Sequence, residues 1–484
     1  MPLPIEIFLY NTLTRAQVPL RPAEDSRLRM YTCGLTVYDY GHIGNYRTFV
    51  AVDILQRFLE SEGYQLESVL NLTDIDDKMI ERAQRAGRSV REHAEIFARA
   101  FAADMEFLGL RRPNHLVRAT DFIPDMIAWI ERLVASGHAY ASQGSVYFRV
   151  ASFPAYGKLS GKPLAELQSG ARVDSDQYEK EEARDFVLWK AHKPGEPAWD
   201  SPWGPGRPGW HIECSVMSMK LLGESFDLHA GGADLIFPHH ENEIAQSEAV
   251  TGRTFVRNWF HVEFLLVNGE KMSKSLGNYY TLRDLAAQGF HASGIRYLLA
   301  SVPHRRQLNF TLEGLRQAES AVERLRAFRD RLRRAALGPG ANPDLEAAIA
   351  SAELRFRGSL AENLNTAGAL AAIFDLLRSA NQALDREALF VPEREAIERL
   401  LSRFDSIFGV VETDDRARLE SYGDGSPSAG STLADEAVER LLAERGAARR
   451  DRNFALADRL RAQLEAAGIV VEDTREGQVR WRRK

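Results

Sequence analysis

The hydrophobic pattern near the start of the chain predicts a strand, a turn and a helix. Residues 28–33 form a short, mostly apolar run of the kind that makes a buried parallel strand. Gly34, Gly41 and Gly44 follow, and glycine gives the backbone freedom to turn. Apolar residues then recur at helical spacing: Phe49, Val52, Ile54, Leu55, Phe58 and Leu59. The helix should begin near Gly44 and Asn45, and its N-terminal N–H groups would favour phosphate.

Further along, strand-like and helical patterns alternate, which indicates an α/β fold. A second buried strand is predicted over residues 65–73, and helices are predicted over 79–109. Residues 119–205 interrupt this order with a helix near 121–137, a strand over 145–150 and a stretch rich in Gly, Pro and Ser. We interpret this segment as an insertion between the two halves of one sheet.

The whole pattern predicts a Rossmann-like parallel-sheet catalytic domain with an insertion, followed by an α-helical bundle and a small C-terminal domain. Long amphipathic helices are predicted within residues 311–336 and 344–411, and residues 421–432 have the composition of a flexible linker. The expected divisions are 1–118 and 206–310 for the two halves of the catalytic domain, 119–205 for the inserted domain, 311–420 for the bundle, and 433–484 for the C-terminal domain.

Composition places the chain among ordinary globular proteins. Of its 484 residues, 44% are hydrophobic and 27% are charged, and the net charge is −6. Any contact with nucleic acid must therefore come from local basic patches. The opening MPLPIEIFLYNTLTR makes a poor signal peptide, and no apolar stretch reaches the length of about 20 residues that a membrane helix needs. We expect a cytoplasmic protein without membrane contact, in which Cys33 and Cys214 stay reduced.

Two short motifs carry the strongest chemical signal. GHIGN at 41–45 stands at the predicted helix start, and KMSKS at 271–275 presents two lysines on a loop bounded by glycines. These motifs resemble the two signatures of class I aminoacyl-tRNA synthetases in order and separation. With TCGLTVYD, NLTDIDDK, GRPGWHIECS and FPHHENEIAQS also present, the chain resembles cysteinyl-tRNA synthetases over nearly its whole length. Asn45 replaces the second histidine of the family's HIGH motif, and an amide can still donate a hydrogen bond to phosphate.

The resemblance implies a reaction in two steps. L-Cysteine and ATP would give cysteinyl adenylate, and the cysteine would then pass to the 3′ end of tRNA(Cys). Attack on the α-phosphate needs positioning and charge stabilisation, with Mg²⁺ on the phosphates of ATP. The expected catalytic residues are His42, Asn45, Lys271 and Lys274. Of these, His42, Asn45 and above all Lys274 are expected to contact ATP.

Five residues are expected around the amino acid. Thr73 ends the second predicted strand, where α/β sheets bind ligands, and Gly34 lies just after the first strand. Trp210, His229 and Asp234 are candidates for the walls of a small-molecule pocket. Core packing is the alternative for Trp210. The resemblance implies instead that Trp210 forms a lid over the amino acid.

The candidate metal ligands are Cys33, Cys214, His239 and Glu243. If a helix starts at Phe237-Pro238, His239 and Glu243 lie one turn apart on one face, and His240 points elsewhere. Thiolate, imidazole and carboxylate together suit zinc, although lone cysteines are more often small buried hydrophobes than ligands. In the family, the matching residues hold zinc, which binds the thiol of the substrate. The resemblance therefore implies one Zn²⁺ per chain.

Metal bonding would also explain the choice of amino acid. A thiolate is a strong ligand for zinc, whereas the hydroxyl of serine and the methyl of alanine are not. A hydrophobic pocket alone separates one small group from another by only about 1 to 3 kcal/mol. We therefore expect that the protein needs no editing domain.

Basic residues near the C-terminus indicate RNA contact. Residues 441–484 contain eleven Lys or Arg and seven Asp or Glu, and the terminal VRWRRK places tryptophan among cations. Arginine neutralises phosphate and tryptophan stacks on an unpaired base, although a basic tail is more often plain surface. By resemblance, residues 433–484 would bind the anticodon, residues 311–420 the tRNA body, and the insertion the acceptor end. We expect a monomer.

Two other functions stay open on the sequence. One is a ligase of the same ancestry that passes cysteine to an amino-sugar in thiol biosynthesis and shares the zinc and ATP motifs. Such ligases are shorter and lack the basic C-terminal unit. The other is a catalytically silent zinc or tRNA-binding protein, which the intact lysine pair of KMSKS argues against. ATP–pyrophosphate exchange that depends on cysteine would exclude the silent protein.

Overall fold

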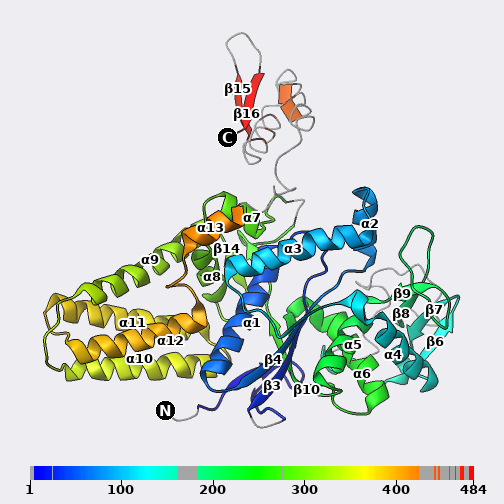
Figure 1. The fold of residues 1–484 in the computed structure, drawn as a ribbon, viewed down its shortest axis with the longest axis horizontal. Helices are drawn as coiled ribbons and strands as arrows, with labels where there is room; N and C mark the ends of the chain where they lie inside the picture. The colour runs from blue at the N-terminus through cyan, green and yellow to red at the C-terminus, as the bar shows by residue number, and fades with distance from the viewer. Residues whose placement is uncertain are drawn as a thin grey trace. The chain divides into compact units, whose positions relative to one another are not determined.

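A five-stranded parallel sheet lies at the centre of the fold (Figure 1). The computed structural model describes residues 5–23, 26–161, 184–273 and 276–423, and beyond these only parts of 441–483. The strand order is β11-β10-β3-β4-β5, and every neighbouring pair is parallel. The strands are β3 (Arg27–Thr32), β4 (Gln65–Leu72), β5 (His115–Arg118), β10 (Phe226–Gly232) and β11 (Val256–Val262). The predicted Rossmann-like sheet is confirmed.

The strand order reverses beside β3. The chain runs outward through β4 and β5, and later it adds β10 and β11 on the other side of β3. In open α/β sheets, ligands bind outside the carboxyl ends of the strands at such a reversal. Cys33 and Gly34 follow β3 directly and so lie at this edge. Helix α1 (Ile43–Ser61) starts nearby and leads back to β4, as the apolar spacing predicted.

Two capped helices connect β4 to β5. Helix α2 (Asp77–Arg85) begins after Asp76, whose side chain accepts a hydrogen bond from the Met79 N–H at 2.6 Å. Helix α3 (Val90–Leu108) begins after Ser89, which forms a reciprocal capping pair with Glu92. The N-terminal strands β1 (Phe8–Asn11) and β2 (Ala16–Pro19) form a separate antiparallel hairpin.

An antiparallel four-stranded sheet occupies the predicted insertion. Its order is β6-β7-β8-β9, with β6 (Ala139–Ser142), β7 (Ser145–Phe148), β8 (Phe186–Ala191) and β9 (Gly206–Pro208). Helix α4 (Ile123–Ala135) precedes it, after the short turn η1 (Ala119–Phe122), and η2 (Val150–Ser152) follows β7. The buried side chains of Phe148 and Trp189 belong to the same apolar cluster as Cys33 and Cys214. The inserted sheet therefore shares its core with the edge of the central sheet where the reversal lies.

The segments after the insertion frame the same edge. Helix α5 (Trp210–Leu222) leads to β10, and the turns η4 (Ala233–Leu235) and η5 (Ile236–His240) connect β10 to α6 (Glu241–Thr251). After β11 come β12 (Leu265–Val267) and β13 (Glu270–Lys271), which form a small sheet with β14 (Leu308–Phe310). Helices α7 (Leu282–Ala287) and α8 (Ala292–Ala300) lie between β13 and β14 in the chain.

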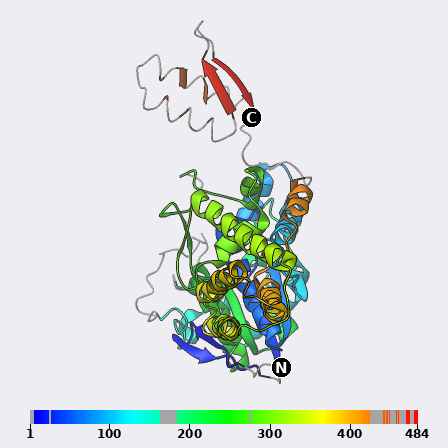
Figure 2. The same cartoon turned by 90° about the vertical axis from the view of Figure 1, so that its left-hand side faces the viewer.

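Four long helices form the predicted bundle: α9 (Leu312–Arg334), α10 (Pro343–Ala361), α11 (Thr366–Asp385) and α12 (Val391–Phe408). Figure 2 looks along these helices and shows them packed side by side. Their apolar stripes meet inside, where Leu325, Phe356, Ile373 and Phe404 are almost fully buried. A short helix, α13 (Asp415–Gly423), follows the bundle.

The C-terminal part belongs to a second compact unit, made of Arg283–Gly289 and Gly423–Lys484. Its strands β15 (Ile469–Asp473) and β16 (Val479–Arg483) pair antiparallel. Most of the predicted linker and the side chains of VRWRRK lie outside the described residues. The domain boundaries stay predictions. Among the described helices, none is both long and apolar enough to cross a lipid bilayer.

Candidate active site and metal centre

Two cysteines far apart in the chain meet at the strand reversal. Cys33 follows β3, and its backbone N–H donates to the carbonyl oxygen of Ala230 on β10 at 3.1 Å. Cys214 lies in α5. The two Sγ atoms are 3.7 Å apart, and both thiols are buried and free of a disulfide. The parallel pairing of β3 with β10 therefore brings the two halves of the sheet to one point.

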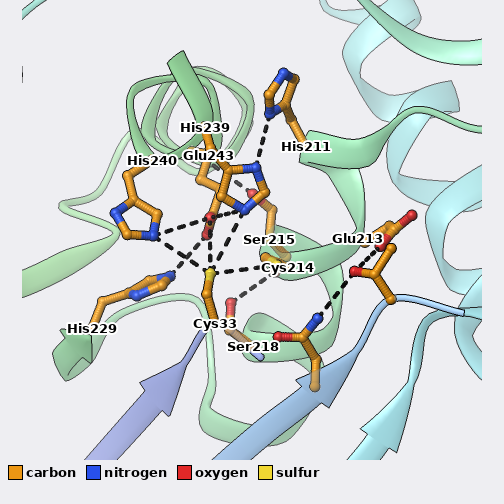
Figure 3. A network of polar contacts seen from close by, with 12 residues as sticks. Cys33, His211, Glu213, Cys214, Ser215, Ser218, His229, His239, His240 and Glu243 are labelled. Atoms are coloured by element: carbon orange, nitrogen blue, oxygen red, sulfur yellow. Dashed lines mark hydrogen bonds and ion pairs between the residues drawn. The ribbon is translucent and has the colours of Figure 1, made fainter. Parts of the chain in front are cut away.

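His239 and Glu243 complete a group of four donors around Cys33 (Figure 3). The Sγ atom of Cys33 lies 3.6 Å from Nε2 of His239 and 3.8 Å from Oε1 of Glu243. Nε2 of His239 lies 3.0 Å from Oε1 of Glu243. All four residues are buried, and their donor atoms lie within 4.8 Å of one another. They form a group able to hold a metal ion.

The spacing and chemistry of this group fit tetrahedral zinc. Zinc bonds thiolate sulfur at about 2.3 Å and imidazole nitrogen at about 2.0 Å. Two sulfur ligands of one ion are then about 3.7 Å apart, and a sulfur and a nitrogen are about 3.5 Å apart. The separations from Cys33 Sγ are 3.7 Å to Cys214 Sγ and 3.6 Å to His239 Nε2. The predicted donor set therefore has the dimensions of a zinc site.

The charges of the group also suit a cation. Burial alone would raise the pKa of the Glu243 carboxyl, but the facing imidazoles of His229 and His239 outweigh it and hold that pKa at about 2. Burial raises the pKa of the Cys33 thiol, and Cys214 and Glu243 raise it further. A bound metal ion reverses this effect, because a coordinated thiol loses its proton. Metal binding here should therefore release protons.

His240 also faces the group, which corrects the expectation that it points elsewhere. Its Nε2 lies 3.4 Å from Cys33 Sγ. His240 precedes Glu243 by three residues, and residues three apart on a helix are neighbours just as residues four apart are, so that the rings of both histidines reach Glu243. The segment before α6 is not a regular helix, because Phe237 has an extended backbone (φ −140°, ψ 131°) and α6 begins at Glu241. Neighbouring histidines consequently reach the same region, and a second possible donor set arises from Cys33, His229, His240 and Glu243.

Two further imidazoles, which the sequence reasoning missed, contact these histidines. Nδ1 of His211 lies 2.9 Å from Nδ1 of His239, and Nε2 of His261 lies 2.8 Å from Nδ1 of His240. Contacts of this kind orient a ligand ring and set its tautomer. His211 could have been found from its spacing, since it precedes Cys214 by three residues on the same helix. Nothing in the sequence singles out His261.

The predicted pocket residues Gly34 and Thr73 are each held by a hydrogen bond to a neighbouring side chain. The Gly34 N–H donates to Oδ1 of Asn71 at 2.9 Å, and a side chain at Gly34 would overlap the backbone oxygen of Asn71. The Thr73 hydroxyl donates to Oε2 of Glu213 at 2.8 Å. Glu213 is fully buried, and burial raises its pKa well above the usual range. The sequence reasoning missed Asn71 and Glu213, which hold these two pocket residues in place.

The other three predicted pocket residues differ in position. Trp210 is half-buried, and its ring stacks on His239 with the centroids 4.2 Å apart. His229 is fully buried behind Glu243, with Nε2 3.0 Å from Oε2. Asp234 is exposed on the turn η4, directly after β10. The structure thus brings Trp210 and His229 to the donor group, while Asp234 lies at the carboxyl edge of the sheet, where burial raises the pKa of its carboxyl group and the charges of His239 and Lys271 lower it.

GHIGN forms the N-terminal cap of α1. The His42 N–H donates to Oδ1 of Asn45 at 3.0 Å, and the Asn45 N–H donates to Nδ1 of His42 at 3.2 Å. This is a reciprocal capping box in which the amide of asparagine serves as the acceptor. Because Nδ1 of His42 accepts a hydrogen bond, the proton of the neutral ring lies on Nε2. His42 is therefore oriented as a donor at the start of the helix.

The described part of the KMSKS loop is held by Asn278. The Ser273 N–H donates to Oδ1 of Asn278 at 2.8 Å, and Nδ2 of Asn278 donates to the carbonyl oxygen of Lys271 at 3.2 Å. Lys271 itself is exposed at the end of β13. Lys274 lies outside the described residues, so its contact with ATP stays a prediction.

The two motifs lie side by side although they are distant in sequence. The Ile43 N–H donates to the carbonyl oxygen of Tyr280 at 2.9 Å, and the ring of Tyr279 meets the ring of His42 edge-on at 5.3 Å. A Cβ atom at Gly44 would lie 3.3 Å from Cε of Met272. The start of α1 and the described part of the lysine loop are therefore in contact, which is compatible with the hypothesis that both bind phosphate.

Family models match most of the chain. The class I (C) catalytic domain of tRNA synthetases matches residues 19–320, a DALR domain matches 355–412, and the cysteinyl-tRNA ligase anticodon binding domain matches 433–482. A cysteine–tRNA ligase of Solibacter usitatus is 52% identical over 475 residues, which is 98% of this chain and 99% of the relative. A cysteine–tRNA ligase of Koribacter versatilis is 49% identical and covers the same shares of both chains.

Comparison with solved structures agrees at the level of the fold. Methionyl-tRNA synthetase of Mycobacterium tuberculosis, solved in complex with methionyl-adenylate, superposes with a TM-score of 0.59 at 18% identity. The match covers 79% of this chain and 88% of the other. Both the sheet topology and the sequence relatives thus confirm the resemblance that the two motifs indicated. The chain belongs to the cysteine–tRNA ligase family of class I aminoacyl-tRNA synthetases.

Proposed function

We propose that this protein activates L-cysteine with ATP and transfers it to tRNA(Cys), with zinc selecting the thiol. The observation that carries the proposal is the buried group of Cys33, Cys214, His239 and Glu243 at the strand reversal of a class I synthetase fold. Soft sulfur donors beside a predicted amino-acid pocket are what recognition of a thiol through a metal requires.

The four donors would hold one zinc ion, and the surrounding residues orient them. Bound zinc supplies a soft cation that bonds a thiolate but not a hydroxyl or a methyl group. The contact between Nδ1 of His211 and Nδ1 of His239 leaves Nε2 of His239 facing the other donors. The Trp210 ring covers His239, so the amino acid would be enclosed between this indole and the pocket residues Gly34 and Thr73.

We assign the stabilisation of the negative charge that develops on ATP to the two motifs. His42 presents its Nε2–H at the start of α1, where the backbone N–H groups also favour an anion. Lys271 and Lys274 add positive charge from the facing loop. Magnesium would accompany the phosphates of ATP and is assigned no residue of the chain. These residues position the carboxylate of cysteine and the α-phosphate and need no covalent intermediate with the protein.

The match of residues 433–482 to an anticodon-binding domain supports tRNA as the acceptor. It also separates this proposal from the amino-sugar ligase, which would have no use for such a domain. We assign the anticodon to this C-terminal part and the tRNA body to the bundle, and we expect the protein to work as a monomer in the cytoplasm.

The test combines zinc content with ATP–pyrophosphate exchange in the purified parent protein and in Cys214→Ser. We expect about one zinc per chain in the parent and exchange that requires cysteine, and we expect both to be lost in the variant. Transfer of labelled cysteine to tRNA(Cys), but not to an amino-sugar, should follow. Exchange that persists in a protein without zinc would contradict the role of the metal, and transfer to the amino-sugar would contradict the acceptor.

A further inference from the structure

A buried carboxylate lies behind the GHIGN motif and has no part in the proposed chemistry. Asp104 on α3 is only 1% exposed. The hydroxyl of Tyr46 donates to one of its oxygens, and the hydroxyl of Tyr422 donates to the other. Tyr46 directly follows Asn45 in the first turns of α1, whereas Tyr422 lies near the end of α13. One carboxylate thus joins the nucleotide motif to the last helix after the bundle.

The phenol of Tyr46 supports the backbone of the motif. A Cβ atom at Gly41 would lie 2.6 Å from the Tyr46 hydroxyl oxygen and 2.9 Å from its ring. The main chain before His42 therefore rests directly on this side chain, which is fully buried. Only glycine can approach the phenol so closely, so a shift of the phenol removes the support on which Gly41 and the cap residue His42 rest.

Tyr422 is held firmly on its own side. Its ring stacks on Phe107 of α3, with centroids 4.2 Å apart and planes inclined by 14°. Nη1 of Arg418 donates to the backbone oxygen of Phe107 at 3.2 Å. At the start of α13, Oδ1 of Asp415 accepts a hydrogen bond from the Ser293 N–H at 3.0 Å. Helix α13 is thus docked on both α3 and α8, and the Tyr422 hydroxyl that it carries has a defined position.

A buried carboxylate depends on its donors. Removing an ionised group from water is unfavourable unless hydrogen bonds replace the water, and donors to a charged acceptor form strong bonds. With a phenol on each oxygen, the Asp104 carboxylate has one preferred orientation. Without the Tyr422 hydroxyl, the carboxylate would turn toward another donor, and its bond to Tyr46 would lose its alignment.

We propose that Asp104 and Tyr422 are positioning residues for adenylate formation, which hold Tyr46 and thereby Gly41 and His42 at the nucleotide site. The inference rests on the proposed function, because it concerns the step in which ATP reacts. Neither residue touches a reacting atom. The loss of either should lower kcat of the exchange reaction and leave the binding of cysteine largely unchanged, because neither residue belongs to the donor group.

The experiment compares Tyr422→Phe, Tyr46→Phe and the double variant in cysteine-dependent ATP–pyrophosphate exchange. We expect each single variant to lower kcat about tenfold and to change KM for cysteine by less than about twofold. Because both hydroxyls act through Asp104, the double variant should be no slower than Tyr46→Phe, although its Tm should fall further. If the two hydroxyls only stabilised the fold, kcat of the double variant would fall further together with its Tm.

Tyr140→Phe is the matched control. The Tyr140 hydroxyl donates to Oδ2 of Asp185 at 2.9 Å, and the exposures of 8% and 1% equal those of Tyr422 and Asp104. This variant loses the same kind of bond in the inserted sheet, so its Tm should fall while kcat stays at the parental value. An unchanged kcat in Tyr422→Phe, additive losses in the double variant, or an equal loss of kcat in Tyr140→Phe would overturn the inference. A parent without cysteine-dependent exchange would refute the proposed function as well.

Discussion

His42 and Asn45 cap helix α1 for each other: each backbone N–H donates to the side chain of the other residue, at 3.0 Å and 3.2 Å. This relationship explains how asparagine can stand at the position of the second histidine of the family's motif. Oδ1 of Asn45 accepts the hydrogen bond that closes the cap. In the described part of the chain, its Nδ2 amide pairs with no other group, so that it remains available as a donor.

Replacing Asn45 with aspartate should separate the two uses of this side chain. Aspartate keeps the acceptor for the His42 N–H, so Tm should stay close to that of the parent. It loses the amide donor and brings negative charge toward the phosphates, so kcat of exchange should fall about a hundredfold. Thermal unfolding and pyrophosphate exchange measure the two effects separately.

Asn45→Ala serves as the comparison for this pair of effects. Alanine removes both the cap acceptor and the amide donor, so the free energy of unfolding should fall by about 1 kcal/mol together with the loss of activity. If Asn45→Asp instead exchanges pyrophosphate at the parental rate, the amide is only a helix cap and takes no part in binding ATP.

The two overlapping donor sets predict different outcomes for two neighbouring histidines. The set with His239 contains both thiols, Cys33 and Cys214, whereas the set with His240 contains only Cys33. Since zinc favours thiolate ligands, we expect it in the first set. His239→Asn should therefore lose most of its zinc on dialysis, and His240→Asn should retain about one ion per chain.

Metal analysis after dialysis against a weak chelator gives the zinc content of both variants. The two substitutions are the same chemical change at adjacent buried positions, so each controls for the other. Retention of zinc in His239→Asn together with loss in His240→Asn would place the ion in the second set and would refute the assignment of ligands.

Asp77 connects α2 to the inserted sheet through two buried cations. Its Oδ1 pairs with Arg207, and its Oδ2 lies 2.5 Å from Nζ of Lys190. Arg207 and Lys190 are nearly inaccessible to water. Removing the carboxylate leaves these cations without this partner, which is more costly than losing an exposed pair. Because the Asp77 side chain is itself 54% exposed, the expected loss for Asp77→Ala is about 2 kcal/mol in the free energy of unfolding.

Glu81→Ala is the control for this prediction, since Glu81 on the same helix is about as exposed as Asp77 but pairs with Arg85, whose side chain is 76% exposed. Its loss should cost no more than about 0.5 kcal/mol. Denaturant unfolding measures both values. Equal costs for the two variants would mean that the link between α2 and the inserted sheet adds nothing beyond a surface ion pair.

The amino-acid pattern predicted two strands of the central sheet, β3 and β4, because each of them carries its own apolar signal, whereas β5, β10 and β11 were not predicted. The apolar runs at 28–33 and 65–73 are long enough to be recognised as strands, and glycines mark the turn before α1. The bundle can be predicted equally well from the sequence, because Leu325 and its apolar neighbours repeat with the period of a helix. These features are local, so spacing alone can reveal them.

The site is different because its residues meet only through pairing of distant strands. That Cys33 comes within reach of Cys214 follows from the contact of β3 with β10, which no local pattern encodes. Family resemblance supplied that information. The spacing argument placed His239 and Glu243 correctly but was wrong about His240, because residues three apart on a helix lie on the same face as residues four apart do.

His304 should make the protein sensitive to acid. Its ring is buried and stacks on Phe260 with centroids 4.2 Å apart. Burial lowers the pKa of His304 to about 3, and the charges of Arg305 and Arg47 act in the same direction. In the unfolded chain the pKa returns to about 6.5. Below that pH the unfolded state binds a proton that the folded state does not bind until about pH 3.

The contribution of His304 to stability is therefore complete above about pH 6.5 and is lost as the pH falls toward 3. His304→Phe keeps a ring against Phe260 and cannot take up a proton. We expect the free energy of unfolding of this variant to fall less steeply between pH 6.5 and 4 than that of the parent, and the two slopes to agree above pH 7. Urea unfolding at a series of pH values measures both slopes. Parallel curves through the acid range would show that His304 is protonated as readily in the folded protein as in the unfolded chain.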